Sequence, residues 1–152
     1  MYWTNDSKDR IFKAHMDGSN VEDVVTGLSI PAGIAIDPVA SRLFWVDYDM
    51  NKVQSSRLDG HDVQLVTQLS SRPWGIAVDS SGRLFWGTYD SKLLQTSETT
   101  GINMRTLHTA THSIQHLTMA GPGPVQTRQN HCEGQNCSGI CVLTATSFRC
   151  LP

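Results

Sequence analysis

This sequence of 152 residues lacks an excess of basic residues, a long apolar run and any sustained helical periodicity. Its 12 Lys and Arg against 14 Asp and Glu give a net charge of -2, which excludes the basic footprint of a nucleic-acid-binding protein. No apolar run reaches the roughly 20 residues of a membrane-spanning helix, so we expect no membrane insertion. Without apolar residues at a period of about 3.6, a helical solenoid is also excluded.

Cysteine is absent from the first 131 residues, and all four cysteines fall within the last 21. An even number at tight spacing, in a segment poor in large apolar residues, favours a disulfide module and a secreted, extracellular protein. A zinc site is the alternative, because the spacing Cys137-x3-Cys141 suits it, but no histidine follows at finger spacing. Four cysteines allow three pairings, and these spacings alone leave the choice open.

An internal repeat of about forty residues runs along most of the chain. The aromatic-Trp pairs that end at Trp3, Trp45 and Trp86 stand 42 and 41 positions apart, and other landmarks keep this step. Each repeat holds four short β-type segments separated by turns rich in Asp, Ser and Gly. Four antiparallel strands at this period are typical of a propeller blade, so we predict an all-β fold of stacked repeats.

Three motifs in register resemble the YWTD (class B) repeats of the low-density lipoprotein receptor family: Tyr2-Trp3-Thr4-Asn5, Ile34-Ala35-Ile36-Asp37-Pro38 and Leu58-Asp59-Gly60. Repeats of that family build six-bladed propellers followed by an epidermal-growth-factor-like module. The resemblance implies a YWTD-repeat half propeller over 1–120, a linker over 121–130 and a truncated EGF-like disulfide module over 131–152. It also implies the disulfides Cys132–Cys141 and Cys137–Cys150.

The number of repeats falls short of a closed ring. Only three aromatic-Trp strands are present, whereas closed propellers have about 4–8 blades. Met1 stands at the second strand of a blade, while segment 114–120 aligns with first strands and has no further strands of its own. In the family, the last strand closes the ring as the inner strand of the first blade. We therefore predict that two chains form one six-bladed ring, a homodimer without open edge strands, and we expect a freestanding protein rather than a receptor fragment.

The residues that mark the repeat have a structural interpretation. Trp3, Trp45 and Trp86 most simply fill the space between blades. Asp37 and Asp79 stand where their carboxylates can satisfy turn amides.

One loop face of the propeller is the predicted ligand site, because binding residues lie mostly on loops held by a rigid scaffold. Trp74 stands out on this face, since its repeat equivalents are Ala32 and Gln115 and no repeated packing role explains it. Local packing of a loop aromatic is the alternative. Trp, Tyr and Arg most often dominate interface energetics. The predicted ligand-binding residues are Tyr48, Asp49, Asn51, Arg72, Trp74, Tyr89, Asp90 and His112.

The predicted ligand is a peptide, a protein or a glycoprotein. In some family propellers an asparagine just before the glycine of the first strand anchors the ligand, but Ala32, Trp74 and Gln115 occupy those positions here. An aromatic flanked by Asp, Asn and Arg equally suits stacking on a sugar ring, so a bivalent lectin is the alternative. A structural or matrix interaction protein is a third. The sequon Asn5-Asp6-Ser7 makes Asn5 the predicted glycosylation site.

Catalytic and metal-binding motifs are lacking. The sequence contains no Gly-x-Ser-x-Gly elbow, no phosphate-binding glycine loop and no Cys/His pair outside the cysteine segment. His108, His112 and His116 are spaced as on one helical face, but in the repeat they fall at a strand end, a loop and a strand start. We therefore expect no enzyme, no cofactor and no metal.

Overall fold

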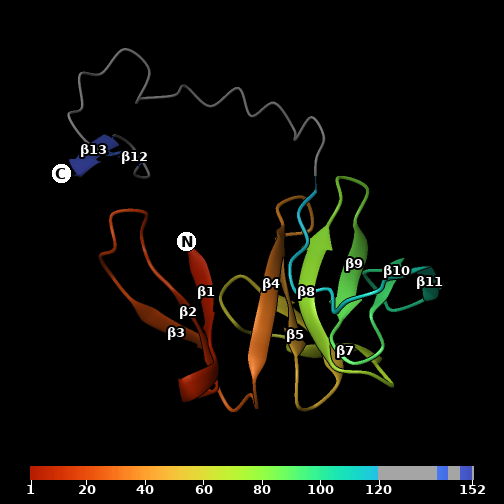
Figure 1. Cartoon of the computed structure of the whole chain (residues 1–152). Coiled ribbons are helices and arrows are strands. Elements are labelled where there is room, and N and C mark those ends of the chain that lie inside the picture. The colour runs from red at the N-terminus through yellow and green to blue at the C-terminus, as the bar shows by residue number, and fades with distance from the viewer. Residues whose placement is uncertain (120–139, 144–147, 152) are drawn as a thin grey trace.

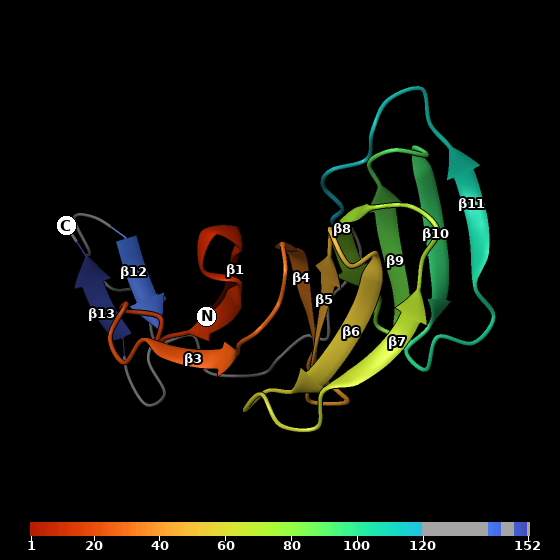
Figure 2. The same ribbon diagram turned by 90° about the horizontal axis from the view of Figure 1, so that it is seen from below.

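The structure, a computed structural model, describes residues 1–119, 140–143 and 148–151, and its regular secondary structure is β-strand apart from one short 3-10 helix. Three antiparallel sheets follow one another along residues 1–109, each with its strands in sequence order (Figures 1 and 2). We name them blades 1, 2 and 3. Blade 1 holds β1 (Tyr2–Asn5), β2 (Arg10–Lys13) and β3 (Glu22–Val25), with the 3-10 helix η1 (Asp6–Lys8) between β1 and β2.

Blades 2 and 3 each have four strands, as the repeat predicts. Blade 2 holds β4 (Pro31–Asp37), β5 (Arg42–Asp47), β6 (Lys52–Arg57) and β7 (Gln64–Gln68). Blade 3 holds β8 (Pro73–Val78), β9 (Arg83–Thr88), β10 (Leu93–Glu98) and β11 (Arg105–Thr109). The prediction of an all-β fold with one antiparallel sheet per repeat is confirmed.

The turns repeat along with the strands. Gly18, Gly60 and Gly101 all have a left-handed backbone, with φ of 82°, 87° and 80°. Each donates its N–H to the carbonyl three residues earlier, which closes the same turn in all three blades. Glycine adopts this conformation without the steric cost that a Cβ brings.

The tryptophans of the repeat pack each blade on the one before it. Trp45 of blade 2 is fully buried and shares a core with Ile11 and Val25 of blade 1. Trp86 of blade 3 is fully buried and shares a core with Phe44 and other apolar residues of blade 2. Burial of such a side chain removes about 150–250 Å² of surface from water, so these aromatics dominate the contact between blades. The predicted packing role is confirmed for Trp45 and Trp86.

The aspartates at the turns after β4 and β8 accept hydrogen bonds from backbone N–H groups, as predicted. Asp37 Oδ1 accepts hydrogen bonds from the N–H groups of Val39 and Ala40, at 2.9 and 3.0 Å. Asp79 Oδ1 accepts from the N–H groups of Ser81 and Arg83, both at 2.9 Å. These carboxylates fix the turns between the first two strands of their blades.

The C-terminal cysteine segment is described only at the hairpin of β12 (Ile140–Leu143) and β13 (Phe148–Leu151). In this antiparallel ladder Cys141 and Cys150 are directly opposite each other. The predicted linker over 121–130, and the predicted partners Cys132 and Cys137, lie outside the described residues.

Candidate functional site

A β-bulge at the start of β8 presents Trp74. Pro73 pairs with Thr88 and Ile76 pairs with Trp86, so β8 has one residue more than β9 between these two points. Such an extra residue leaves the ladder and re-aims a side chain, and bulges are common beside functional sites. Trp74 therefore lies within β8 and is half-buried, whereas the sequence predicted it on a loop of the ligand face.

Three aromatic rings gather around this bulge. Tyr48 follows β5, Tyr89 follows β9, and their N–H groups donate to the carbonyls of Ile30 and Arg72, at 2.9 and 2.7 Å. The Tyr48 ring meets the Trp74 ring edge to face, with centroids 5.1 Å apart and planes 86° apart. The Tyr89 ring lies 6.0 Å from that of Tyr48 and 5.8 Å from that of Trp74. We call Tyr48, Trp74 and Tyr89 the aromatic cluster.

A partly exposed ion pair lies beside the aromatic cluster. The Arg72 guanidinium is 5.2 Å from the centre of the Tyr48 ring, and one of its nitrogens donates to the Tyr48 hydroxyl at 3.4 Å. Its Nε lies 3.7 Å from Oδ2 of Asp90. The hydrogen bond to the Tyr48 hydroxyl, followed by the negative charges of Asp90 and Asp49, raises the pKa of Arg72 above its ordinary value. Arg72 is thus a fixed cation, as every guanidinium is, with two carboxylates near it.

The aromatic cluster adjoins a groove along the innermost strands of blades 2 and 3. Its volume is about 240 Å³. Glycine allows β4 to approach β8, and β8 to approach the segment at Gln115. A Cβ on Gly33 would stand 2.6 Å from the carbonyl oxygen of Trp74, and one on Gly75 would stand 2.6 Å from that of Gln115. The groove is lined by Ala32, Gly33, Ile34, Trp74, Gly75, Ile76, Gln115, His116 and Leu117.

The remaining residues that the sequence predicted as site residues lie outside the aromatic cluster. Asp49 is an exposed loop residue that acts on Arg72 through its charge. Asn51 has a left-handed backbone at the end of its loop, and its backbone carbonyl accepts a hydrogen bond from the N–H of Leu69. The side-chain Oδ1 of Asn51 is buried. His112 is exposed, with Nδ1 2.9 Å from the Thr111 hydroxyl. Asn5 caps η1 by accepting from the N–H of Lys8 at 3.0 Å. No contact described by the structure joins Asn5, Asn51 or His112 to the aromatic cluster.

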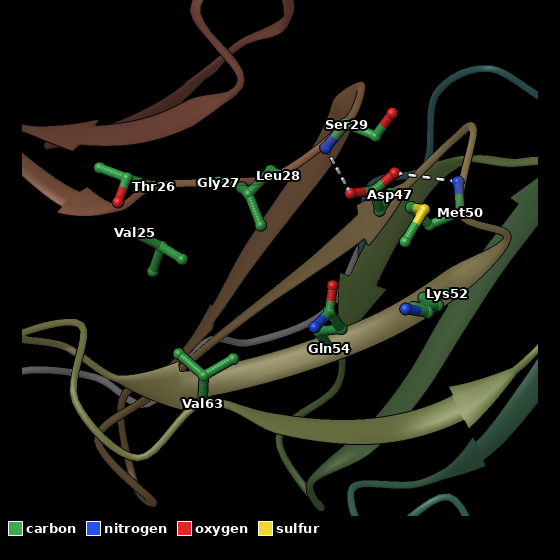
Figure 3. Close-up of a pocket in the computed structure, with 10 residues that line it drawn as sticks. All are labelled: Val25, Thr26, Gly27, Leu28, Ser29, Asp47, Met50, Lys52, Gln54 and Val63. Atoms are coloured by element: carbon green, nitrogen blue, oxygen red, sulfur yellow. Dashed lines mark hydrogen bonds between the residues drawn. The ribbon is translucent and has the colours of Figure 1, made fainter.

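A second pocket, of about 410 Å³, lies between blades 1 and 2 and was not predicted from the sequence (Figure 3). Asp47 stands at its wall, and its carboxylate accepts from the N–H groups of Ser29 and Met50 at 2.9 and 3.1 Å. Because Asp47 is almost fully buried and already bonded to the backbone, it holds the loop rather than a ligand. The pocket follows from the spacing of two sheets, which no local motif encodes.

Within the part of the chain that the structure describes, no three His, Cys, Asp or Glu residues lie close enough together to hold a metal ion. The described residues include no helix with the length and apolar character needed to cross a membrane.

Comparison with known proteins identifies the first repeat. Residues 1–38 match the family model of the low-density lipoprotein receptor repeat class B. The low-density lipoprotein receptor-related protein 4 of Homo sapiens is 48% identical over 44 residues, and the mouse and rat proteins match equally. That match covers 28% of this chain and 2% of the human protein, so the chain spans a small part of the length of these relatives.

The fold extends the likeness beyond the first repeat. A nidogen/laminin complex contains a chain that superposes with a TM-score of 0.70 and 26% identity, over 74% of this chain and 45% of that chain. A gluconolactonase from Xanthomonas campestris superposes with a TM-score of 0.62 and 18% identity, over 72% of this chain and 37% of that one. At that identity the second match shows the fold alone. The three sheets thus resemble part of a YWTD-type propeller.

Proposed function

We propose that this chain is a non-catalytic, extracellular recognition protein that binds a protein or peptide ligand on its loop face. The observation that carries this proposal is the aromatic cluster, which three separate segments build beside one guanidinium. Interface hot spots are enriched in Trp, Tyr and Arg, and they lie in packed patches from which water is excluded. The cluster supplies this chemistry at one point of the surface.

The size of the groove favours a protein ligand over a free small molecule. Pockets for small molecules commonly have volumes of about 300–1,000 Å³, whereas the groove beside Trp74 has about 240 Å³. A space of this size suits one side chain of a larger ligand, whose surrounding surface would cover Tyr48 and Tyr89. The presence of a chain with this fold in a nidogen/laminin complex supports the same class of ligand.

A bivalent lectin is the second candidate, because Tyr89 is 40% exposed and stands beside Asp90, which is also exposed. An exposed ring beside a carboxylate can stack on a sugar and bind its hydroxyl groups. Binding the chain to immobilised laminin and to a glycan array in parallel separates the two candidates. We expect a signal on laminin that free sugars do not inhibit; a signal confined to glycans would establish the lectin instead.

We also propose that the recognition unit is a homodimer in which two chains complete one ring. Each ring would then carry two copies of the aromatic cluster. Linking two sites in this way can raise the overall avidity by about 10²–10⁴ without any new contact in either site. Glycosylation at Asn5 and the disulfides Cys132–Cys141 and Cys137–Cys150 remain part of this proposal.

A further inference from the structure

Contacts between neighbouring blades follow one pattern, and it occurs twice. The tryptophan of each later blade packs in the apolar layer of the blade before it: Trp45 beside Ile11, and Trp86 beside Val53. The glycine of each later blade also lies on an outer strand of the blade before it. A Cβ on Gly60 would collide with the carbonyl oxygen of Val24, and one on Gly101 with that of Val66.

In blade 1, the tryptophan and the glycine of this pattern have no preceding blade to pack on among the described residues. Trp3 is the equivalent of Trp45 and Trp86, yet it is only half-buried and stacks on Phe12 of its own blade, with centroids 5.5 Å apart. Gly18 has the same left-handed backbone as Gly60, but nothing lies within 4 Å of where its Cβ would stand. Among the described residues, no preceding blade covers this face.

In blade 3, the apolar layer and the outer strand that would receive the tryptophan and glycine of a following blade are exposed. Leu94 is the equivalent of Ile11 and Val53, which are both fully buried, but it is partly exposed. Leu107 is the equivalent of Val66, whose carbonyl lies under Gly101, and it is 45% exposed. This face therefore offers the apolar layer and the outer-strand carbonyl that Trp3 and Gly18 lack.

The inner edges are complementary as well. Blade 1 has three strands, and β1 pairs with β2 alone among the described residues, so its other edge lacks the strand that β4 supplies to β5. Segment 114–119 lies against β8 as β8 lies against β4, since Gly75 approaches Gln115 as closely as Gly33 approaches Trp74. Yet this segment belongs to none of the described sheets. One end has an unpaired edge, and the other end has an unpaired segment.

We infer that the face of Trp3 and Gly18 docks on the face of Leu94 and Leu107 of a second copy, and that segment 114–119 of that copy pairs with β1 as the innermost strand. The inference rests on the dimer proposed above, not on the ligand. Because the same two faces meet at both junctions, two half-rings that each span 180° close into one ring, in which blade 1 also gains its fourth strand.

The repeat also gives the register of the new pair. In blade 2, Ala35 lies opposite Phe44 and Ile34 lies opposite Trp45. The equivalent positions place Thr118 opposite Tyr2 of the second copy, and Leu117 opposite Trp3. Directly opposed residues in an antiparallel pair have Cα atoms about 4.5–5.5 Å apart, which is within the range of a disulfide.

The first test is the mass in solution, measured by light scattering at micromolar concentration. We expect twice the chain mass of 16.8 kDa. Leu107→Glu should give a folded monomer, because it places a carboxylate in the apolar junction. Leu65→Glu is the matched control. Leu65 is an exposed residue of the outer strand β7, and its equivalent positions in blades 1 and 3 hold the polar residues Asp23 and Thr106. The Leu65→Glu variant should remain a dimer. A folded wild-type monomer, or an open polymer, would overturn the inference.

The second test is cross-linking between two different single variants, Tyr2→Cys and Thr118→Cys, mixed in equal amounts and oxidised. We expect a disulfide between Cys introduced at position 2 of one chain and at position 118 of the other, identified by peptide mapping. Thr4→Cys mixed with Thr118→Cys is the out-of-register control and should cross-link at least tenfold less. Equal cross-linking of both mixtures, or none in the first, would contradict the pairing, even where ligand binding persists.

Discussion

The rings of Tyr48 and Trp74 meet at nearly a right angle, with centroids 5.1 Å apart, although they come from different blades. This contact joins the loop after β5 to the bulge at the start of β8. Edge-to-face pairs of this kind contribute about 0.5–1.5 kcal/mol beyond their buried area. The proposed binding surface is therefore held in place before a ligand arrives, which lowers the entropic cost of binding.

We predict that Trp74→Ala lowers the free energy of unfolding by about 1–2 kcal/mol, because it removes two aromatic contacts at a half-buried position. Trp86→Ala should cost about 3–5 kcal/mol, since Trp86 is fully buried between blades. Urea denaturation measures both. Equal losses would contradict the placement of Trp74 outside the interblade core.

A hydrogen bond distinguishes two equivalent tryptophans. Trp86 Nε1 donates to Gln95 Oε1 at 3.1 Å, whereas Trp45 Nε1 is buried without a partner among the described residues. Gln95→Ala leaves the Trp86 donor unsatisfied and should cost about 1–3 kcal/mol. Gln54→Ala, at the equivalent position opposite Trp45, should cost clearly less. A larger loss for Gln54→Ala in the same denaturation series would reverse this assignment.

The turn glycines give a test of blade packing. Gly101→Ala should destabilise the fold by more than about 2 kcal/mol, because it combines a left-handed φ with a collision against Val66. Gly27→Ala has a φ of 73° but open space around its Cβ, so it should cost only the backbone strain of about 1 kcal/mol. Thermal melting of both variants decides; indistinguishable melting temperatures would refute the close packing at Gly101.

Stability in acid should depend on Asp79. Burial raises the pKa of Asp79, but hydrogen bonds from the Ser81 hydroxyl and from the backbone and side chain of Arg83 outweigh it and lower that pKa from 3.8 to about 2. The folded pKa lies below the ordinary value, so ionised Asp79 stabilises the fold above pH 3.8, and this stabilisation is lost as the pH falls through about 2.

Asp79→Asn should therefore lower the free energy of unfolding by about 1 kcal/mol at pH 7, and the difference from wild type should shrink as the pH approaches 2. Asp49→Asn, at an exposed loop carboxylate, is the control and should change little at either pH. Urea titrations at pH 7, 4 and 2 measure the effect. A difference that stays constant over this range would show that Asp79 acts without its charge.

Much of the fold could be predicted because each turn carries local chemistry. Gly18, Gly60 and Gly101 require the left-handed region, and the step between them fixes the period of the sheets. The placement of Trp74 could not be predicted in the same way. A bulge depends on one extra residue relative to the facing strand, and the sequence of β8 alone does not show how many residues of β9 it spans.

The candidate site was predicted in part. Tyr48, Arg72, Trp74, Tyr89 and Asp90 gather in the structure, because equivalent positions of adjacent repeats fall on neighbouring loops. Asn51 and His112 were predicted on the same loop face, but no contact among the described residues joins them to the cluster. Loop membership is a property of the repeat, whereas the direction of a side chain depends on local turns such as the left-handed backbone of Asn51.

The measurement that tests the central claim most directly compares the affinity of wild type, Trp74→Ala and His61→Ala for whichever probe, laminin or glycan, the wild type binds. His61 is exposed on the β6–β7 hairpin, at the opposite end of the strands from the aromatic cluster. We predict that Trp74→Ala weakens binding about 30-fold or more, which corresponds to the 2 kcal/mol or more of a hot spot, while His61→Ala binds as wild type does. Unchanged affinity of a folded Trp74→Ala, together with a loss in His61→Ala, would contradict the account and place recognition on the opposite face.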